Sequence, residues 1–252
     1  MRSDGYIIGD GGIEYSYGKV RHLSLTDKNL DLLSIYGGLI KKAFNIEGTL
    51  RKKKGNSNSL RFPNYLAGYF KNIDSKILVS SPKRQVPGFI FNLPKREISA
   101  FIGGLFDAEG TCGHHFVSFS YSSLILIEEI QVLLLKFGLQ SYIYPDFEEN
   151  KKKWRYQLNI YSQRQLKQFV REIGFNSDTK KEKLLRYLSS LSQNPKNSFS
   201  DPLPLKEEII KAKKELAVSC YDIPGRLQYH LKYSNTLKRE NIKEFMKIFS
   251  KY

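Results

Sequence analysis

Two acidic residues, Asp10 and Glu109, stand at the ends of two glycine-containing stretches, 99 residues apart. One stretch reads GYIIGDG from residue 5, and the other reads GLFDAEG from residue 104. If both stretches are helical, each acid falls in the last turn, where the helix dipole disfavours a carboxylate. Two such acids brought together would also repel each other, so we expect a divalent cation to neutralise them. This arrangement suits phosphodiester hydrolysis, because the metal positions a water and stabilises the developing phosphoryl charge.

The small residues of the two stretches predict how the acids could meet. They share one helix face at i, i+4 spacing, as Gly5 and Gly9 in the first stretch and Gly104 and Ala108 in the second. A face of small residues lets a second helix approach closely, backbone against backbone. We therefore expect the two helices to pack side by side. Gly110, directly after the second acid, is expected to adopt the left-handed conformation of a helix C-cap.

The same order of expected elements follows each motif. Hydrophobic periodicity and turn-forming clusters predict helix, hairpin, helix, hairpin and helix in each half. The later helices are expected at 29–44, 64–71, 124–137 and 163–173, and the later hairpins at 49–62 and 142–161. The predicted fold class is α+β, with two similar halves related by a pseudo-two-fold axis.

The sequence also predicts where the halves end. We place them at residues 1–97 and 98–195. Residues 196–252 are expected to form a linker and a small C-terminal helical extension. The linker is expected at 198–205, where prolines gather and periodicity is weak, and the helices at 207–215 and 239–249.

The composition indicates an anionic partner. The 252 residues carry a formal charge of +16, and 40% are hydrophobic, which is enough for a core. This charge favours nucleic acid over a membrane. No apolar run approaches the ~18 residues of a transmembrane span, and no signal peptide is visible, so a cytoplasmic protein without a membrane partner is expected. Two cysteines are too few for a disulfide framework or a zinc site.

Basic residues in the expected hairpins are the candidates for contact with double-stranded DNA. Alternate side chains of a strand share one face, and a curved antiparallel sheet can enter the major groove. The candidates are Lys19, Arg21, Arg51, Lys52, Lys53, Lys54 and Arg61 in the first half, and His114, Lys151, Lys152, Lys153 and Arg155 in the second. Phosphate neutralisation by this set would make binding fall steeply with salt.

The motif of the second half resembles that of a known family. The run FIGGLFDAEG from residue 101 is similar to the second motif of LAGLIDADG homing endonucleases, in the form common among archaeal and intein-associated members. Two other runs are also similar to those proteins: VPGFIFNLP from residue 86, and IGFNS from residue 173 followed by Lys180. The similarity spans about residues 5 to 190 and is stronger in the second half.

The resemblance implies a fold, an activity and roles for single residues. It implies a monomeric, site-specific endonuclease that cuts both DNA strands, with a saddle-shaped antiparallel sheet in each LAGLIDADG repeat. Asp10 and Glu109 match the acids that bind Mg²⁺ or Mn²⁺, and Lys180 matches a lysine that supports the hydrolytic water. Lys83 is our choice for its counterpart, because it follows Asp10 by 73 residues, as Lys180 follows Glu109 by 71. Asp107, the other acid of the second motif, is expected to be a structural polar group.

Two other functions are compatible with these residues. One is a protein of the same fold that binds nucleic acid without efficient cleavage, such as an RNA maturase or a DNA-binding regulator. The other is a structural protein whose glycine-faced helices only mediate assembly. The sequence blocks needed for self-splicing are absent, which favours a free-standing or excised nuclease.

Overall fold

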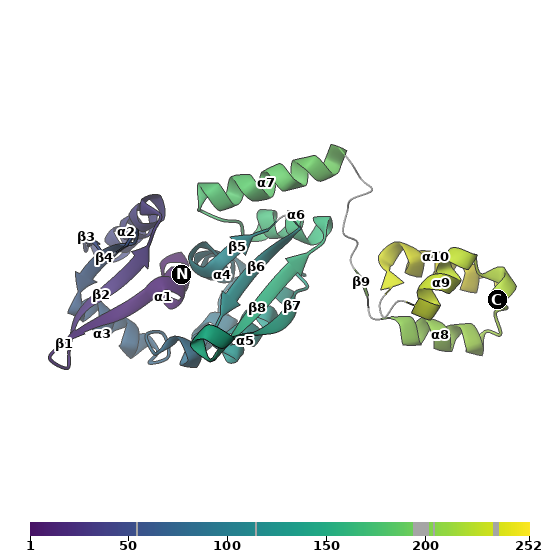
Figure 1. Cartoon of the computed structure of the whole chain (residues 1–252), viewed down its shortest axis with the longest axis horizontal. Helices are drawn as coiled ribbons and strands as arrows, with labels where there is room; N and C mark the ends of the chain where they lie inside the picture. The colour runs from purple at the N-terminus through teal and green to yellow at the C-terminus, as the bar shows by residue number, and fades with distance from the viewer. Residues whose placement is uncertain (54, 114, 194–201, 204, 234–236) are drawn as a thin grey trace. The chain divides into compact units, whose positions relative to one another are not determined.

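A computed structural model describes residues 1–53, 55–113, 115–193, 202–203, 205–233 and 237–252 of the chain. The chain forms two compact units. The first contains residues 1–161 and 165–195, and the second contains residues 162–164 and 196–252. Figure 1 shows the elements of both units along the chain. Among the described residues, no helix is both long and apolar enough to span a membrane.

The first unit repeats one order of elements twice. The first repeat consists of α1 (Arg2–Asp10), β1 (Gly11–Ser16), β2 (Lys19–Asp27), α2 (Leu30–Phe44), β3 (Thr49–Lys52), β4 (Asn58–Pro63) and α3 (Asn64–Ile73). The second consists of α4 (Lys95–Glu109), β5 (Gly110–Cys112), β6 (Phe116–Tyr121), α5 (Leu124–Leu135), β7 (Tyr142–Glu148), β8 (Lys153–Tyr161) and α6 (Gln163–Glu172). The α+β fold with two similar repeats is therefore confirmed.

Short and long helical segments connect and extend these repeats. The 3-10 turns η1 (Ser81–Lys83) and η2 (Gly88–Asn92) lie between them, and η3 (Glu149–Lys151) joins β7 to β8. A further helix, α7 (Asp178–Gln193), follows the second repeat and was not predicted as an element. Its sequence is dominated by charged and serine residues, so its apolar stripe is weak.

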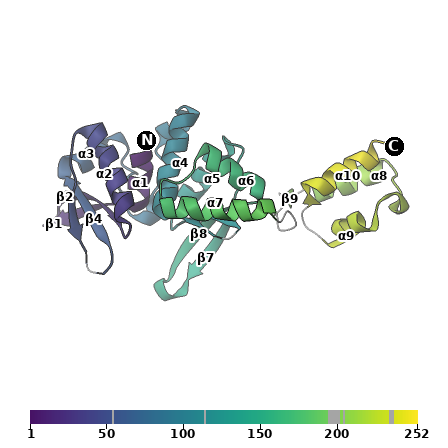
Figure 2. The same ribbon diagram turned by 90° about the horizontal axis from the view of Figure 1, so that it is seen from above.

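Each repeat forms a four-stranded antiparallel sheet with the same strand order. The orders are β1-β2-β4-β3 and β5-β6-β8-β7. In β2, the apolar residues Leu23 and Leu25 alternate with Ser24, which is also buried. One face of the sheet therefore carries the apolar side chains that pack on helices, and we call the opposite, polar face the open face. In Figure 2 the β7–β8 ribbon extends beyond the helices of its repeat.

One apolar core runs through both repeats. Buried residues of α1, α4 and both sheets belong to a single cluster, which makes the repeats one folded body. The outer helices begin at matching caps: the Asn29 side chain accepts from the backbone N–H groups of Asp31 and Leu32, and the Ser123 side chain accepts from that of Leu126. These caps fix where each sheet strand ends and the next helix starts.

The second unit is small and helical. It contains α8 (Lys206–Glu215), η5 (Cys220–Asp222), α9 (Gly225–Tyr233) and α10 (Arg239–Phe249) around its own apolar cluster. The short strands β9 (Pro202–Leu203) and β10 (Leu237–Lys238) pair antiparallel. The helices expected at 207–215 and 239–249 are present, whereas α9 was not predicted. Most of the expected linker at 198–205 lies outside the described residues.

The expectation of a left-handed cap at Gly110 was wrong. Gly110 has φ −79° and ψ 152°, and its equivalent Gly11 has φ −77° and ψ 142°, both extended. Glycine is needed there for space: a Cβ atom would lie 2.3 Å from the Phe106 oxygen at Gly110 and 2.2 Å from the Ile7 oxygen at Gly11. The chain turns directly from each helix into a strand, so the acids stand where helix and sheet meet.

Candidate active site

Helices α1 and α4 pack backbone against backbone at their glycines. A Cβ atom on Gly5 would lie 2.0 Å from the backbone oxygen of Phe101, and one on Gly104 would lie 2.0 Å from that of Arg2. Positions 101 and 104 correspond to positions 2 and 5, so the contact is reciprocal, as a two-fold axis between the helices requires. The predicted side-by-side packing is confirmed, and Figure 1 shows the pair between the two sheets.

The last turns of these helices carry the two acids. A Cβ atom on Gly9 would lie 2.4 Å from the Cβ atom of Ala108, so the backbones also touch directly before the acids. Burial, with the nearby charges of Glu109 and Asp27, raises the pKa of the Asp10 carboxyl to about 8. Burial also raises the pKa of Glu109, while Arg155 lowers it. Because its pKa lies near 8, the Asp10 carboxyl retains a proton at neutral pH and can exchange it for a cation.

The side chain of Lys180 lies at the end of α4. Its Nζ donates to the backbone oxygens of Phe106 at 3.2 Å and Asp107 at 2.5 Å. Burial lowers the pKa of Lys180, although Asp107, Asp10, Asp27 and Glu109 raise it. The amine therefore caps the helix that carries Glu109 and adds positive charge beside the acids.

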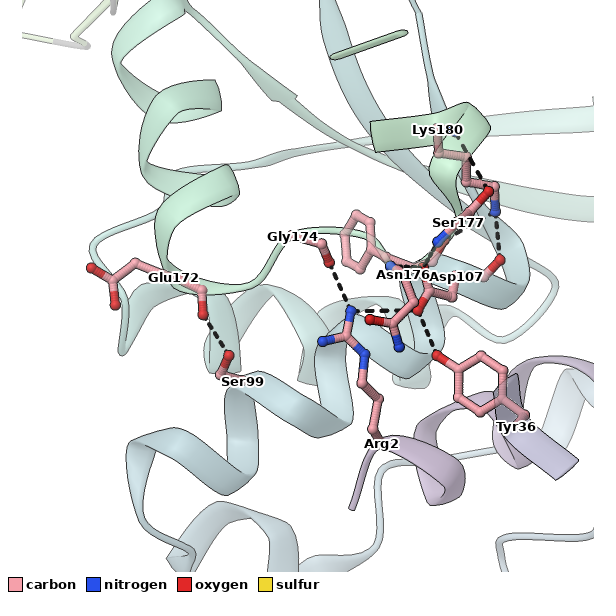
Figure 3. A network of polar contacts seen from close by, with 10 residues as sticks. Arg2, Tyr36, Ser99, Asp107, Glu172, Gly174, Asn176, Ser177 and Lys180 are labelled. Atoms are coloured by element: carbon pink, nitrogen blue, oxygen red, sulfur yellow. Dashed lines mark hydrogen bonds and ion pairs between the residues drawn. The ribbon is translucent and has the colours of Figure 1, made fainter. Parts of the chain in front are cut away.

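A buried network around Asp107 holds Lys180 in this place (Figure 3). The Asp107 carboxylate accepts from the Tyr36 hydroxyl at 2.5 Å and from the backbone N–H groups of Asn176 at 2.8 Å and Ser177 at 3.2 Å. Arg2 lies 3.4 Å away and also donates to the oxygen of Gly174 at 3.1 Å. Asp107 therefore has the structural role expected of it, because it fixes the start of α7 against α4.

Arg84 is the corresponding group at the end of α1, and sequence reasoning missed it. Its guanidinium donates to the backbone oxygens of Ile8, of Gly9 at 2.9 Å and of Gly11 at 2.5 Å. The side chain is buried, whereas Lys83, chosen from its spacing, lies exposed in η1. Spacing alone could not separate two adjacent cations, since only the path of the connecting segment decides which one turns inward.

Asp27 is a second functional candidate that the sequence did not reveal. Its carboxylate accepts from the Tyr6 hydroxyl at 2.7 Å and from the backbone N–H of Asn29 at 2.9 Å. Its charge raises the pKa values of Asp10 and Glu109, which places a third carboxylate near the pair. Nothing in the motif marks this residue, because the turn at the end of β2 brings it to the site.

The predicted DNA contacts of the first repeat fall on both faces of its sheet. Strand register places Arg51 and Arg61 with Ser24 on the open face. Glu14 lies on the same face, 2.8 Å from Arg61 and 3.7 Å from Lys53. A bulge at Arg21 interrupts the alternation of β2, so Lys19, which pairs with Ser16, lies on the open face, whereas Lys52 lies on the side that faces the helices. Lys19, Arg21 and Lys52 are all exposed. Lys54 lies outside the described residues.

The predicted contacts of the second repeat gather at the β7–β8 end. Lys151, Lys152 and Lys153 are exposed around the turn, and Lys151 lies 2.9 Å from Glu148. Arg155 lies on the open face and joins the acid site, with its Nη2 atom 3.4 Å from an oxygen of Glu109. His114 lies outside the described residues.

Comparison with known proteins identifies the fold. A model of the LAGLIDADG-like domain matches residues 4–79 and 96–174. The chain is 31% identical over 212 residues to glutamine–fructose-6-phosphate aminotransferase of Methanocaldococcus jannaschii, and 30% identical over 192 residues to the probable translation initiation factor IF-2 of the same organism. These matches cover 82% and 69% of this chain but only 19% and 16% of those proteins.

A solved structure of another protein has a similar fold. The crystal structure of I-DmoI in complex with DNA and Mn superposes with a TM-score of 0.53 at 24% identity. The superposition covers 69% of this chain and 94% of that one. The two matched segments of the family model correspond to the two structural repeats. The chain therefore belongs to the LAGLIDADG-like family, with one domain copy in each repeat.

Proposed function

We propose that this protein is a site-specific endonuclease that cuts both strands of DNA with the help of a divalent cation, Mg²⁺ or Mn²⁺. The observation that carries the proposal is the reciprocal packing of α1 and α4, which brings Asp10 and Glu109 to one place. Both acids come from one chain, so a monomer can form the site. The I-DmoI structure, which holds DNA and Mn, supports the choice of substrate and metal.

The donor set of the site fits a hard divalent cation. Among the described residues, no three His, Cys, Asp or Glu side chains gather at metal-binding distance, so the chain offers two carboxylates rather than a complete cage. Mg²⁺ is usually bound in this way, by one or two carboxylates together with waters and substrate phosphates. Asp10 and Glu109 would hold it. When bound, such a cation would polarise a phosphate oxygen and acidify its bound water.

The protein's own groups around the acids would prepare the phosphate for attack. Lys180 and Arg84 place positive charge at the ends of α4 and α1, where charge develops during hydrolysis. Arg155 reaches Glu109 at the end of α4 from the open face of the second sheet, so it can contact a phosphate next to the cleaved bond. Burial of the site keeps these interactions strong.

The open faces of the two sheets would bind the flanking DNA. Arg51 and Arg61 lie on the open face of the first sheet. Lys153 and Arg155 lie on the open face of the second sheet. An antiparallel ribbon on each side of the acid pair can follow the major groove on each side of the cut. We infer a long, non-palindromic target, because the two faces carry different side chains.

The curated relatives support a mobile origin. This chain matches less than a fifth of an aminotransferase and of an initiation factor, proteins whose names describe unrelated activities. A segment shared by unrelated proteins is expected of an element inserted into host proteins. We therefore propose that the enzyme derives from an intein-like element and targets the uninterrupted site.

The test is cleavage of DNA in which this uninterrupted site is restored. The substrate is a plasmid carrying the sequences that flank the coding region, joined directly, and a library of genomic fragments serves as a second substrate. We expect double-strand breaks that require Mg²⁺ or Mn²⁺ and disappear in Asp10→Asn and Glu109→Gln. The matched controls Asp31→Asn and Glu128→Gln, at exposed positions of α2 and α5, should cleave normally. Failure to cut either substrate, alongside tight RNA binding, would overturn the proposal in favour of a maturase.

A further inference from the structure

Helix α7 has no equivalent helix in the first repeat, and it lies beside a hairpin that is shorter than its counterpart. In the first repeat, β1 and β2 contain six and nine residues and meet at a turn that includes Tyr17. In the second repeat, β5 and β6 contain only three and six residues. Helix α7 contacts the short strand β5 (Figure 1). The second repeat therefore presents a helix next to the place where the first presents a long β-ribbon.

The apolar core and the turn after β5 both hold α7 in place. Leu184 and Leu188 are buried in the core that the two repeats share. Tyr187 reaches the turn, where its hydroxyl lies 3.2 Å from Nδ1 of His115 and its ring meets the His115 ring edge-on. The start of the helix is fixed by the hydrogen bonds of Asp107. Side chains on α7 are thus presented by an anchored element, which a binding surface requires.

A groove of about 550 Å³ lies between α7 and the turn after β5. Its volume falls in the ~300–1,000 Å³ range of ligand sites. Gly113 lines the groove from the turn, and Lys183, Arg186 and Tyr187 line it from α7. Among the described residues of the lining, Glu182 is the only acid, so positive charge prevails. A groove of this size and charge can take a sugar–phosphate segment of a nucleic acid.

The two cations of the groove lack a neutralising partner. Lys183 and Arg186 are exposed, and within the described chain neither forms an ion pair, although Glu182 lies one turn from Arg186. They are three residues apart and share one helix face, where like charges destabilise the helix. By contrast, Arg61 and Arg155 on the open faces of the sheets already pair with carboxylates. A phosphate in the groove would relieve the repulsion by accepting hydrogen bonds from both cations.

The groove lies a short way along α7 from the acid pair. Lys180, whose Nζ atom caps the end of α4, belongs to the first turn of α7. A helix rises about 1.5 Å per residue, so Lys183 and Arg186 follow Lys180 along the axis by roughly 5 and 9 Å. One DNA strand places a phosphate about every 3.4 Å along the duplex axis, so a strand that passes Glu109 can reach the groove within about three nucleotides.

From these observations we infer that the groove beside α7 binds the DNA backbone close to the cut, with Lys183 and Arg186 donating to one phosphate. The inference rests on the proposed endonuclease function and adds a substrate contact outside the two sheets. Cations that meet a phosphate position the duplex without reading its sequence. Lys183 and Arg186 are therefore binding residues: every target sequence needs them for affinity, whereas the bond-breaking step does not.

The salt dependence of DNA binding by the full-length protein tests this contact. Fluorescence anisotropy with the restored target duplex, in buffer without divalent metal, gives the association constant at several salt concentrations. We expect the double variant Lys183→Gln/Arg186→Gln to bind roughly tenfold more weakly at physiological salt. The slope of the logarithm of the association constant against that of the salt concentration should become shallower by about 1, because one phosphate contact is lost.

Two further variants are the controls for this experiment. Lys167→Gln/Lys181→Gln removes the same charge from exposed positions outside the groove and should leave the slope unchanged. Lys183→Arg/Arg186→Lys keeps both charges in the groove and should bind within about threefold of the wild-type protein. A variant with a smaller folded fraction would bind less DNA without a change of slope, and circular dichroism measures that fraction independently.

An uncharged phosphate analogue locates the contact on the DNA. Target duplexes carry a single methylphosphonate at successive positions on each strand. The wild-type protein should lose about tenfold in affinity at one phosphate, within about three nucleotides of the cut. Lys183→Gln/Arg186→Gln should lose almost nothing further at that phosphate, because the contact is already absent. Its single-turnover cleavage rate at saturating enzyme should stay within about threefold of the wild-type rate.

Failure of this inference and failure of the proposed function give different results. An unchanged salt slope in Lys183→Gln/Arg186→Gln, or the same change in slope in Lys167→Gln/Lys181→Gln, would overturn the groove as a specific phosphate site. Independent, additive losses from the variant and the methylphosphonate at every position would overturn it as well. In all these cases cleavage by the wild-type protein is intact. Absence of any target cleavage by the wild-type protein would instead refute the endonuclease function.

Discussion

The Nζ atom of Lys180 lies 2.5 Å from the backbone oxygen of Asp107, at the end of the helix that carries Glu109. A cation at a helix C-terminus offsets the dipole that disfavours the neighbouring carboxylate. The amine comes from α7, a helix outside the two repeats, and it reaches the acid site because Asp107 anchors the chain at Asn176 and Ser177. One buried aspartate thus couples the position of a distant amine to the acid pair.

Loss of this amine should impair cleavage more than binding. In Lys180→Met the site keeps its acids but loses the charge at the end of α4, and we expect the single-turnover cleavage rate to fall about 100-fold. The affinity for target DNA, measured by gel shift, should change less than about threefold. Lys181→Met, at the exposed neighbouring position, is the matched control and should cleave normally. Equal losses of cleavage rate in Lys180→Met and Lys181→Met would show that Lys180 has no specific role in cleavage.

The helix pair should not tolerate a methyl group at its closest point. Gly104→Ala would place a Cβ atom 2.0 Å from the Arg2 oxygen, so α1 and α4 must separate. We expect the free energy of unfolding, measured with urea, to fall by about 3 kcal/mol or more. Gly38→Ala in α2 has open space around the new Cβ atom and should stabilise the protein by about 0.5–1 kcal/mol. Similar changes in the free energy of unfolding of Gly104→Ala and Gly38→Ala would contradict the close packing of α1 against α4.

Arg84 should contribute more to stability than its neighbour Lys83. Arg84→Ala would leave buried oxygens of α1 and the Tyr121 hydroxyl without their donor. The expected loss is about 2–4 kcal/mol in urea unfolding. Lys83→Ala, on the exposed 3-10 turn, should cost no more than about 0.5 kcal/mol. A larger loss for Lys83 than for Arg84 would show that the connecting segment runs differently.

The raised pKa of Asp10 makes the stability of the metal-free protein depend on pH. The folded state holds a proton on Asp10 up to about pH 8, whereas the unfolded carboxyl releases it near pH 3.8. The folded state therefore binds more protons between these values, so stability falls as the pH rises from about 4 to about 8. Burial is the main cause, Glu109 and Asp27 add to it, and Lys180 and Arg84 oppose it.

Substitution of Asp10 should flatten this pH profile. Asp10→Asn removes the titrating group, and we expect it to be more stable than the wild-type protein at pH 8 by on the order of 2 kcal/mol and about equal at pH 4. Urea unfolding at both pH values measures the difference. Saturating Mg²⁺ should shift the wild-type profile in the same direction, since metal replaces the proton. If the free energy of unfolding of Asp10→Asn fell with pH as steeply as that of the wild-type protein, Asp10 would not be the buried group that titrates in this range.

The sequence predicted those parts of the site that depend on local patterns. Gly5 and Gly104 mark the helix contact by spacing, and Asp10 and Glu109 follow from the same spacing. The order of helices and hairpins was predictable too, because each element buries one periodic face. These features repeat in both halves, and the repetition separates them from chance.

The remaining parts depend on contacts between distant segments. The path of the connecting segment decides that Arg84 points inward and Lys83 outward. Two contacts hold that path: the Ser123 hydroxyl donates to the backbone oxygen of Arg84, and Glu129 accepts from the backbone N–H of Val86. Asp27 reaches the acids through the end of β2 and the stacked ring of Tyr6, and no motif marks it. Such long-range placement leaves no local pattern in the chain.

The central claim is that Asp10 and Glu109 act together on one bound metal, and a double-mutant cycle tests it directly. Asp10→Glu and Glu109→Asp change the reach of each carboxylate but keep its charge, and single-turnover Mg²⁺ cleavage of the restored target gives a rate for each variant and for the pair. Shared metal binding predicts strong coupling between the two positions. The fold-change in cleavage rate of the double variant should differ by at least about tenfold from the product of the fold-changes of the two single variants. Effects that simply multiply would show two independent acids and contradict the account.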